Sequence, residues 1–370
     1  MAQATLPVQR RRSVPSLRIP GLQKASAAYL LALIIVLFGI WIPDTFLTDT
    51  TFKVVAADQV VIGILGLALL IPLTAGVFDL SVGAMLAFSL VVVSWLEANT
   101  GLNGVLSCVV AILACGAVGF LSGLVVVRFR VDSFIATLGM SQILSAASLY
   151  ISENKQIVGV LSPRFLEFGR RDLLGVPIVV YYLVILALAI WYVLECTPLG
   201  RHLFATGSNP EAARLSGVRT DRMVWGSLVA SAMVAGVAGV VYGAKIGSFS
   251  NTFGPPLLFP AFAAVFFGAT QFKSRPNVWG TILAVYTLAF GVKGLQLAFT
   301  SGVYWITPLF NGIALVVAVA LASRQVAAVR RRRTLEGAPP APGSDAAPND
   351  GRTRGTSPQG ADEPGTVLRT

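Results

Sequence analysis

Residues 105–127 read VLSCVVAILACGAVGFLSGLVVV, a stretch without a charged side chain that ends directly at Arg128. A helix of about 20 apolar residues crosses a hydrocarbon core about 30 Å thick. Backbone within lipid must satisfy its own hydrogen bonds, so apolar blocks of this length are expected to be helices. The predicted spans cover 25–42, 54–75, 80–97, 105–127, 133–151, 177–195, 223–243, 259–271, 278–298 and 304–323. The sequence therefore predicts an all-α membrane protein with about ten transmembrane helices.

Composition agrees with a lipid-facing surface. Of the 370 residues, 55% are hydrophobic and 12% are charged, and the mean hydropathy is +0.75. A soluble domain carries about 25% charged residues. The net charge of +11 does not indicate nucleic-acid binding, because the basic residues lie at the ends of apolar blocks, as in Arg10–Arg12 and Arg330–Arg333. The expected surroundings are therefore membrane lipid, and nucleic acid is excluded as a partner.

The positions of lysine and arginine predict the orientation of the spans. With the N-terminus inside, the inner segments hold 18 Lys and Arg residues and the outer segments hold six. Cytoplasmic loops carry the excess of these residues in membrane proteins. Both termini are therefore expected in the cytoplasm. The polar loop 152–176 is then outside, and the polar stretch 196–222 is cytoplasmic.

Three regions follow from these patterns. Residues 1–24 are polar and basic and predict a flexible cytoplasmic arm. The apolar stretch 25–42 is too long for the core of a signal peptide, so it is expected to be the first span. Residues 25–323 form the predicted transmembrane domain. Residues 324–370 are first basic and then rich in Pro, Gly, Ala and Ser, which predicts a disordered cytoplasmic tail.

The stretch TPLGRHLFATGSNPEAARLSGV, residues 197–218, contains the signals of a short helix. Ser208 is the candidate N-cap, and Glu211 three residues later would complete a capping box. Pro210 suits the first turn, where its missing N–H costs nothing. Gly217 is the candidate stop. The pattern predicts a capped helix of about seven residues in a cytoplasmic loop.

An isolated helix of this length is unstable in water, so it is expected to dock. Ala212, Ala213 and Leu215 would enter a groove on a partner, as in helix-in-groove recognition. Alternatively, the helix packs on its own protein. The residues alone do not separate the two interpretations.

Three motifs resemble those of ABC importer permeases of the ribose and simple-sugar type. The family's coupling motif G-x-N-P-E-A-A-R-L-S-G is matched from Gly207 to Gly217. FDLSVGAMLAFS (78–89) and FIATLGM (134–140) resemble two further blocks, whereas Val77-Phe78 and FGATQFKSRPNVWG (267–280) depart from the family pattern. The residues implied in coupling to an ATPase are Gly207, Ser208, Asn209, Pro210, Glu211, Ala212, Ala213, Arg214, Leu215, Ser216 and Gly217.

The resemblance covers roughly residues 25–323 and implies a set of partners. These are two cytoplasmic ABC ATPase domains, an extracytoplasmic sugar-binding protein, and a second permease subunit, either another copy or a paralogue. It also implies a multi-pass location in the bacterial inner membrane. The solute expected is a monosaccharide, moved inward by alternating access. A nucleoside or branched-chain amino acid permease of the same class is the nearest alternative.

Several polar residues fall at or near membrane depth. Asp79 opens the predicted third span, either as an N-cap or with a direct transport role. Lys293 and Gln296 share one face of the ninth span, and a lysine there normally faces a cavity or a partner. Snorkelling of Lys293 to the outer interface is the competing interpretation. The candidate pathway or structural residues are Asp79, Ser81, Gly83, Thr137, Lys293 and Gln296.

Other function classes fit the sequence less well. The chain has no GxxxxGK[ST] motif, so ATP is expected to be used by a partner ATPase and this chain is expected to bind no cofactor. The residues show no metal-ligand pattern and no catalytic cluster, so the chain is not expected to be an enzyme. An ion-coupled secondary transporter usually needs acidic residues at membrane depth. Asp79, Glu97 and Glu195 all lie at the ends of predicted spans.

Overall fold

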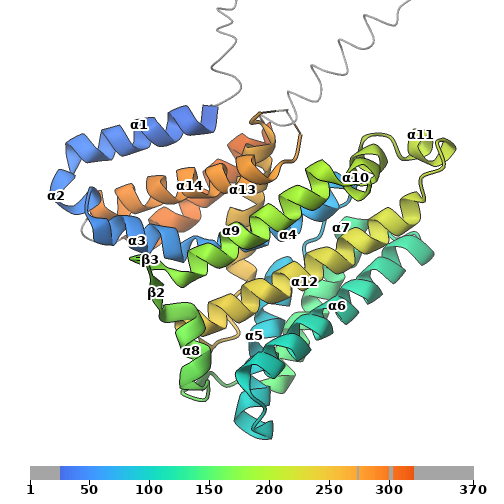
Figure 1. Ribbon diagram of the computed structural model, residues 1–370, viewed down its shortest axis with the longest axis horizontal. Coiled ribbons are helices and arrows are strands. Elements are labelled where there is room, and N and C mark those ends of the chain that lie inside the picture. The colour runs from blue at the N-terminus through green and yellow to red at the C-terminus, as the bar shows by residue number, and fades with distance from the viewer. Residues whose placement is uncertain (1–25, 273–274, 300–302, 321–370) are drawn as a thin grey trace, which may run out of the picture. The chain divides into compact units, whose positions relative to one another are not determined.

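The computed structural model describes residues 26–272, 275–299 and 303–320, and helices dominate them (Figure 1). Among these residues, eight helices are long and apolar enough to cross a membrane. Two of them consist of two consecutive elements: Asp49–Thr74 comprises α3 (Asp49–Asp58) and α4 (Val60–Thr74), and Ile178–Cys196 comprises α9 (Ile178–Trp191) and the π-helix η1 (Tyr192–Cys196). The other six are α5 (Val82–Thr100), α6 (Gly104–Arg128), α7 (Ser133–Ile151), α12 (Thr220–Ile246), α14 (Val278–Ala298) and Val303–Ala320, which opens with η3 (Val303–Trp305).

Two shorter apolar helices complete the set of predicted span positions. They are α1 (Ser26–Trp41) and α13 (Leu258–Ala269). The predicted all-α membrane fold is confirmed, and each predicted span coincides in position with one of these helices. The predicted N-terminal arm, 1–24, and the predicted tail from residue 324 onward lie outside the described residues.

The remaining elements are short and lie between the long helices. The predicted polar loop 152–176 contains an amphipathic helix, α8, whose Phe165 and Gly169 are buried one turn apart. Two antiparallel strand pairs, β1–β4 and β2–β3, have two residues in each strand. The bounds are α2 (Pro43–Phe46), β1 (Ile157–Val158), α8 (Pro163–Arg170), β2 (Asp172–Leu173), β3 (Val176–Pro177), α10 (Pro198–Ser208), α11 (Pro210–Leu215), β4 (Ser248–Phe249) and η2 (Pro255–Leu257).

The core is built around α4, which packs against α9, α12, α13 and α14. Its sequence VVIGILGLALLIPLT is apolar on every side, as expected of a helix surrounded by protein. Small residues bring neighbouring helices close together. A Cβ on Gly119 of α6 would lie 2.5 Å from the Cβ of Ala232 on α12, and Figure 1 shows these two helices side by side.

The long helix α12 connects two ends of the described structure. We call them the α11 end, with α10, α11 and the first turn of α12, and the α8 end, with α8, α3 and the last turn of α12. At the α11 end, Asp221 pairs with Arg130 and Arg214 at 3.5 and 3.7 Å. At the α8 end, Arg170 donates to the carbonyl oxygens of Lys245 and Ile246. The loop 152–176 and the stretch 196–222 thus lie at opposite ends.

Candidate functional site

The short helix α11 exists, but it starts one residue later than predicted. Asn209 is the N-cap, and its side chain accepts the backbone N–H of Ala212 at 3.0 Å. Ser208 ends α10 instead, where its hydroxyl donates to the carbonyl oxygen of Ala205. The predicted capping box is therefore wrong, because Glu211 stands only two residues after the true N-cap and is exposed. The physical reason is Pro210, which disfavours helical backbone at the residue before it.

The end of α11 was predicted correctly. Gly217 has φ +84°, a left-handed conformation that glycine adopts without a steric penalty. The N–H of Gly217 donates to the carbonyl oxygen of Arg214, and the N–H of Val218 donates to that of Ala213, both at 3.0 Å. These two bonds are the Schellman pattern. The helix therefore spans six residues and has a defined cap at each end.

One side of α11 rests on its own chain and the other is open. Ala213 is 5% exposed and packs inward, so the prediction that it contacts a partner is wrong. Ala212 is exposed, and Leu215 is 91% exposed. The last residue of α11 is therefore an apolar side chain that the rest of the described chain leaves uncovered. The interpretation that the helix packs on its own protein is confirmed for Ala213, whereas docking of Ala212 and Leu215 on a partner stays a prediction.

Gly207, the first residue of the coupling motif, lies against the end of α4. A Cβ at Gly207 would contact the carbonyl oxygen of Thr74 and would lie 2.9 Å from the backbone nitrogen of Gly76. Gly76 itself has φ +82°. Two backbone segments therefore touch without an intervening side chain. This contact joins α10, which α11 follows directly in the chain, to the point where α4 ends.

The segment that follows Gly76 is held on α7. The N–H of Phe78 donates to the hydroxyl of Ser133 at 3.2 Å, and that of Leu80 donates to the hydroxyl of Thr137 at 3.0 Å. The two motifs that begin near Phe78 and Phe134 in sequence are thus bound to each other. Backbone groups within this non-helical segment find partners on a neighbouring helix, which is the condition for irregular backbone at membrane depth.

Asp79 is 2% exposed, and its carboxylate accepts the N–H and the hydroxyl of Ser81 at 3.0 and 2.5 Å. Asp79 accepts the backbone N–H two residues on, as an N-cap side chain does, although α5 itself spans Val82–Thr100 and Ser81 makes no side-chain cap bond. The direct transport role of Asp79 stays a prediction. Gly83 lies against the backbone of Gly254, since a Cβ placed on Gly83 would lie 3.0 Å from the carbonyl oxygen of Gly254. The structure therefore brings Asp79, Ser81, Gly83 and Thr137 together.

Lys293 and Gln296 lie apart from that group, on α14. The Gln296 amide donates to the hydroxyl of Thr307 at 2.8 Å, which ties α14 to the Val303–Ala320 helix. Lys293 is half-buried. Their shared role in a pathway or a subunit seam stays a prediction.

An ion pair at the α11 end was not predicted. The guanidinium of Arg275 donates to both carboxylate oxygens of Glu195 at 2.7 and 2.6 Å, and it lies 4.2 Å from the ring centroid of Phe204. Glu195 belongs to the π-helix η1, Phe204 to α10, and Arg275 to the connection between α13 and α14. The sequence did contain the two opposite charges near the ends of predicted spans, Glu195 at the end of 177–195 and Arg275 between 259–271 and 278–298. A single sequence does not show that such distant charges meet.

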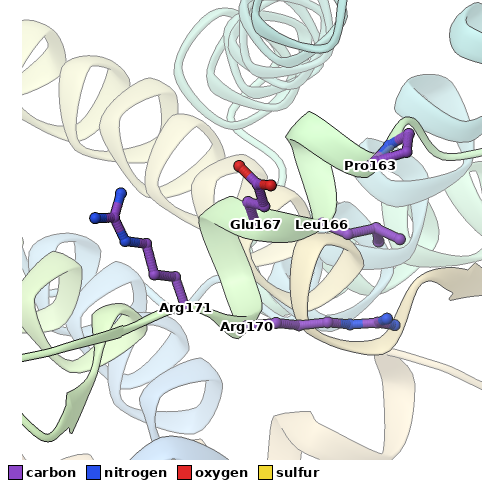
Figure 2. Close-up of a pocket in the computed structure, with 5 residues that line it drawn as sticks. All are labelled: Pro163, Leu166, Glu167, Arg170 and Arg171. Atoms are coloured by element: carbon purple, nitrogen blue, oxygen red, sulfur yellow. The ribbon is translucent and has the colours of Figure 1, made fainter.

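The α8 end has an open hollow of about 630 Å³ along α8, lined by Pro163, Leu166, Glu167, Arg170 and Arg171. Figure 2 shows Glu167 and Arg171 directed away from Arg170, which lies along the end of α12 that it binds. The hollow is rimmed by charges of both signs, which suits contact with a protein surface.

Replacing Thr137 by valine tests the junction between the two motifs. Valine has the shape of threonine but leaves the N–H of Leu80 without its acceptor. An unpaired buried donor costs about 1–3 kcal/mol, and because Leu80 is half-buried the cost falls at the lower end of that range. We expect thermal unfolding of the purified protein at a clearly lower Tm. Thr137→Ser keeps the hydroxyl and is the matched control. A valine variant as stable as the serine variant would show that this bond does not hold the segment.

Comparison with known proteins gives a consistent result. The family model described as "Branched-chain amino acid transport system / permease component" matches residues 53–322. The chain is similar to the fructose import permease protein of Rhizobium meliloti, with 31% identity covering 79% of this chain and 82% of that protein. It is 31% identical to the ribose import permease protein of Escherichia coli (strain K12), over 71% of this chain and 82% of that protein.

A third relative is the D-allose transport system permease protein of Escherichia coli (strain K12), with 28% identity over 80% of this chain and 91% of that protein. No solved structure matches the chain. The matched region, 53–322, contains α11, the contact of Gly207 with the end of α4, and the junction with α7.

Proposed function

Because this chain belongs to the branched-chain amino acid transport system / permease component family, we propose that it is the membrane-spanning subunit of an ABC importer whose solute is a simple sugar. The family description alone would also fit a branched-chain amino acid. The similar import permeases carry the names of fructose, ribose and D-allose, and these favour a monosaccharide.

The observation that carries this proposal is the construction of α11. A six-residue helix with a cap at each end and Leu215 at 91% exposure is preformed for docking and too short to serve as a core element. Its attachment to the end of α4 through Gly207 gives a docked partner a rigid route into the membrane domain. ATP would be bound and hydrolysed by that partner, and this chain would be a transporter subunit without catalysis of its own.

The partners follow from the two ends. The α11 end would face the cytoplasm, since the stretch 196–222 is basic. On that side the permease would bind two ABC ATPase domains. The α8 end would face outward and receive the sugar-binding protein, with the charged rim of the α8 hollow as part of the contact. Both termini would be cytoplasmic, in the bacterial inner membrane. A second permease subunit would complete the pathway.

In the proposed cycle, closure of the ATPases moves α11 and α10 together. Gly207 transmits this displacement to Thr74–Gly76 and so to the segment that ends at Ser81. That segment is bonded to Ser133 and Thr137, so α7 follows it. Packed elements of this kind move as rigid bodies between discrete arrangements, which is what alternating access requires.

The proposal is tested by reconstitution. The chain is purified with its cognate ATPase and binding protein, and uptake of fructose, ribose, allose and leucine into proteoliposomes is compared. We expect ATP-dependent uptake of one of the sugars and no uptake of leucine. Uptake of leucine would show that the solute is an amino acid. If the purified chain never associates with an ATPase, the proposal of an ABC importer is refuted.

Leu215→Asp should remove the ATPase from the purified complex. The substitution places a charge in the apolar contact that the exposed leucine would make, and desolvating that charge on docking is costly. Loss of an interface anchor typically weakens binding by more than about tenfold. Leu174→Asp is the matched control, because Leu174 is also 91% exposed but lies at the α8 end. Equal ATPase retention by both variants would count against docking at α11.

A further inference from the structure

A groove runs along the outer side of α6 and α12 near the α11 end. It has a volume of about 400 Å³, and apart from Arg222 its lining is apolar, with Phe120, Trp225, Gly226 and Met233 among the residues that form it. Phe120 and Met233 are exposed, so the groove opens on the outer surface of the helix bundle.

The walls of the groove are held in place. The indole N–H of Trp225 donates to the carbonyl oxygen of Phe120 at 3.1 Å, and the two rings pack with centroids 4.7 Å apart. Trp225 also packs against Gly123 of α6, where a Cβ would collide with the indole ring. At Gly226 the floor is open: among the described residues, no atom of another helix lies within 4 Å of a Cβ placed there. The groove is therefore a shallow, largely apolar hollow whose aromatic wall is held in place.

One end of the groove carries a positive charge. Arg222 lines it directly. The two helices run antiparallel, with Gly123 against Trp225 and Gly119 against Val229, so Arg128 at the end of α6 comes level with the first turn of α12. The neighbouring carboxylate of Asp221 pairs with Arg130 and Arg214. Within the described part of the chain, no ion pair joins Asp221 to Arg222.

We propose that this groove binds an anionic phospholipid of the membrane. The acyl chain would lie along the apolar floor from Gly226 towards Met233, and the phosphate would lie at the basic end beside Arg222 and Arg128. Basic pockets between transmembrane helices on the cytoplasmic side bind anionic head groups. Charge complementarity at one end and an apolar floor along the rest match such a lipid and not a soluble anion. The site goes beyond the proposed transport function and uses none of its residues, but it rests on the proposed cytoplasmic placement of the α11 end.

The test is native mass spectrometry of the full chain released from mixed micelles that contain equal amounts of phosphatidylglycerol and phosphatidylcholine. We expect phosphatidylglycerol to be retained over phosphatidylcholine by at least about threefold. Arg128→Gln with Arg222→Gln should bring this ratio to about one. Gly226→Leu, which fills the floor without changing charge, should lower retention of both lipids.

Arg164→Gln with Arg171→Gln is the matched control, because it also removes two positive charges, at the α8 end. The proposal is overturned if the wild-type protein shows no preference, or if this control lowers the ratio as much as the Arg128 and Arg222 double variant does. A photo-crosslinking residue at position 226 should yield lipid adducts in membranes. Protein adducts would overturn the proposal and assign the groove to a protein partner. The Arg128 and Arg222 double variant keeps the test decisive if Gly226→Leu fails to fold.

Discussion

Gly207→Ala is expected to reduce sugar uptake by at least about tenfold, equivalent to about 1.4 kcal/mol. The added methyl group would contact the carbonyl oxygen of Thr74 and lie 2.9 Å from the nitrogen of Gly76. Backbone cannot move aside as a flexible side chain does, so α10 must shift away from α4. Overpacking of this kind costs about 1–3 kcal/mol. The change disturbs the close backbone contact between α10 and the end of α4, through which the displacement of α11 reaches the membrane domain in our proposal.

The decisive measurement compares ATP hydrolysis with uptake in the same proteoliposomes. Hydrolysis should continue while uptake falls, because α11 and its caps are unchanged. Gly312→Ala is the control, since among the described residues no atom lies within 4 Å of a Cβ at Gly312. Unchanged uptake per ATP hydrolysed in the Gly207→Ala variant would show that the contact of Gly207 with the end of α4 is not part of the coupling route.

Breaking the Glu195–Arg275 pair is expected to have the second large effect. Glu195→Gln or Arg275→Gln removes two charge-assisted bonds, and bonds to charged groups contribute about 1.5–3 kcal/mol each. The Arg275 side chain is 35% exposed and that of Glu195 is 20% exposed, so water recovers part of this loss. The pair links η1, α10 and the α13–α14 connection, and we expect uptake per ATP to fall several-fold.

The exchanged pair Glu195→Arg with Arg275→Glu distinguishes an ion pair from simple packing. If the pair positions α10, the exchange should recover part of the uptake that either single charge reversal loses. Asp49→Asn is the control, because it breaks an exposed pair with Lys53 at 2.7 Å on α3. Full uptake in Glu195→Gln would refute the positioning role, and it would leave the transport function itself untouched.

Local sequence signals predicted most of the helices and part of the candidate site. The apolar blocks predicted the positions of the membrane helices because hydropathy is a property of each segment alone. Gly217 predicted the end of α11 for a similar reason, since the Schellman turn depends on one residue's conformational freedom. The start of α11 was predicted one residue early, because the Ser–Glu spacing and the Asn-Pro pair are competing start signals and the helix uses the second.

Other features depended on residues far apart in the chain. Helix α8 was missed because a short amphipathic segment resembles a polar loop until α12 supplies the surface that buries Phe165. The sequence alone determined that this chain is a bundle of apolar helices with a capped helix between two of them. Only the tertiary structure decided that Gly207 meets Gly76, that Thr137 holds Leu80, and that Arg275 pairs with Glu195. Each of these contacts depends on how whole helices pack, and no local periodicity encodes which of their surfaces meet.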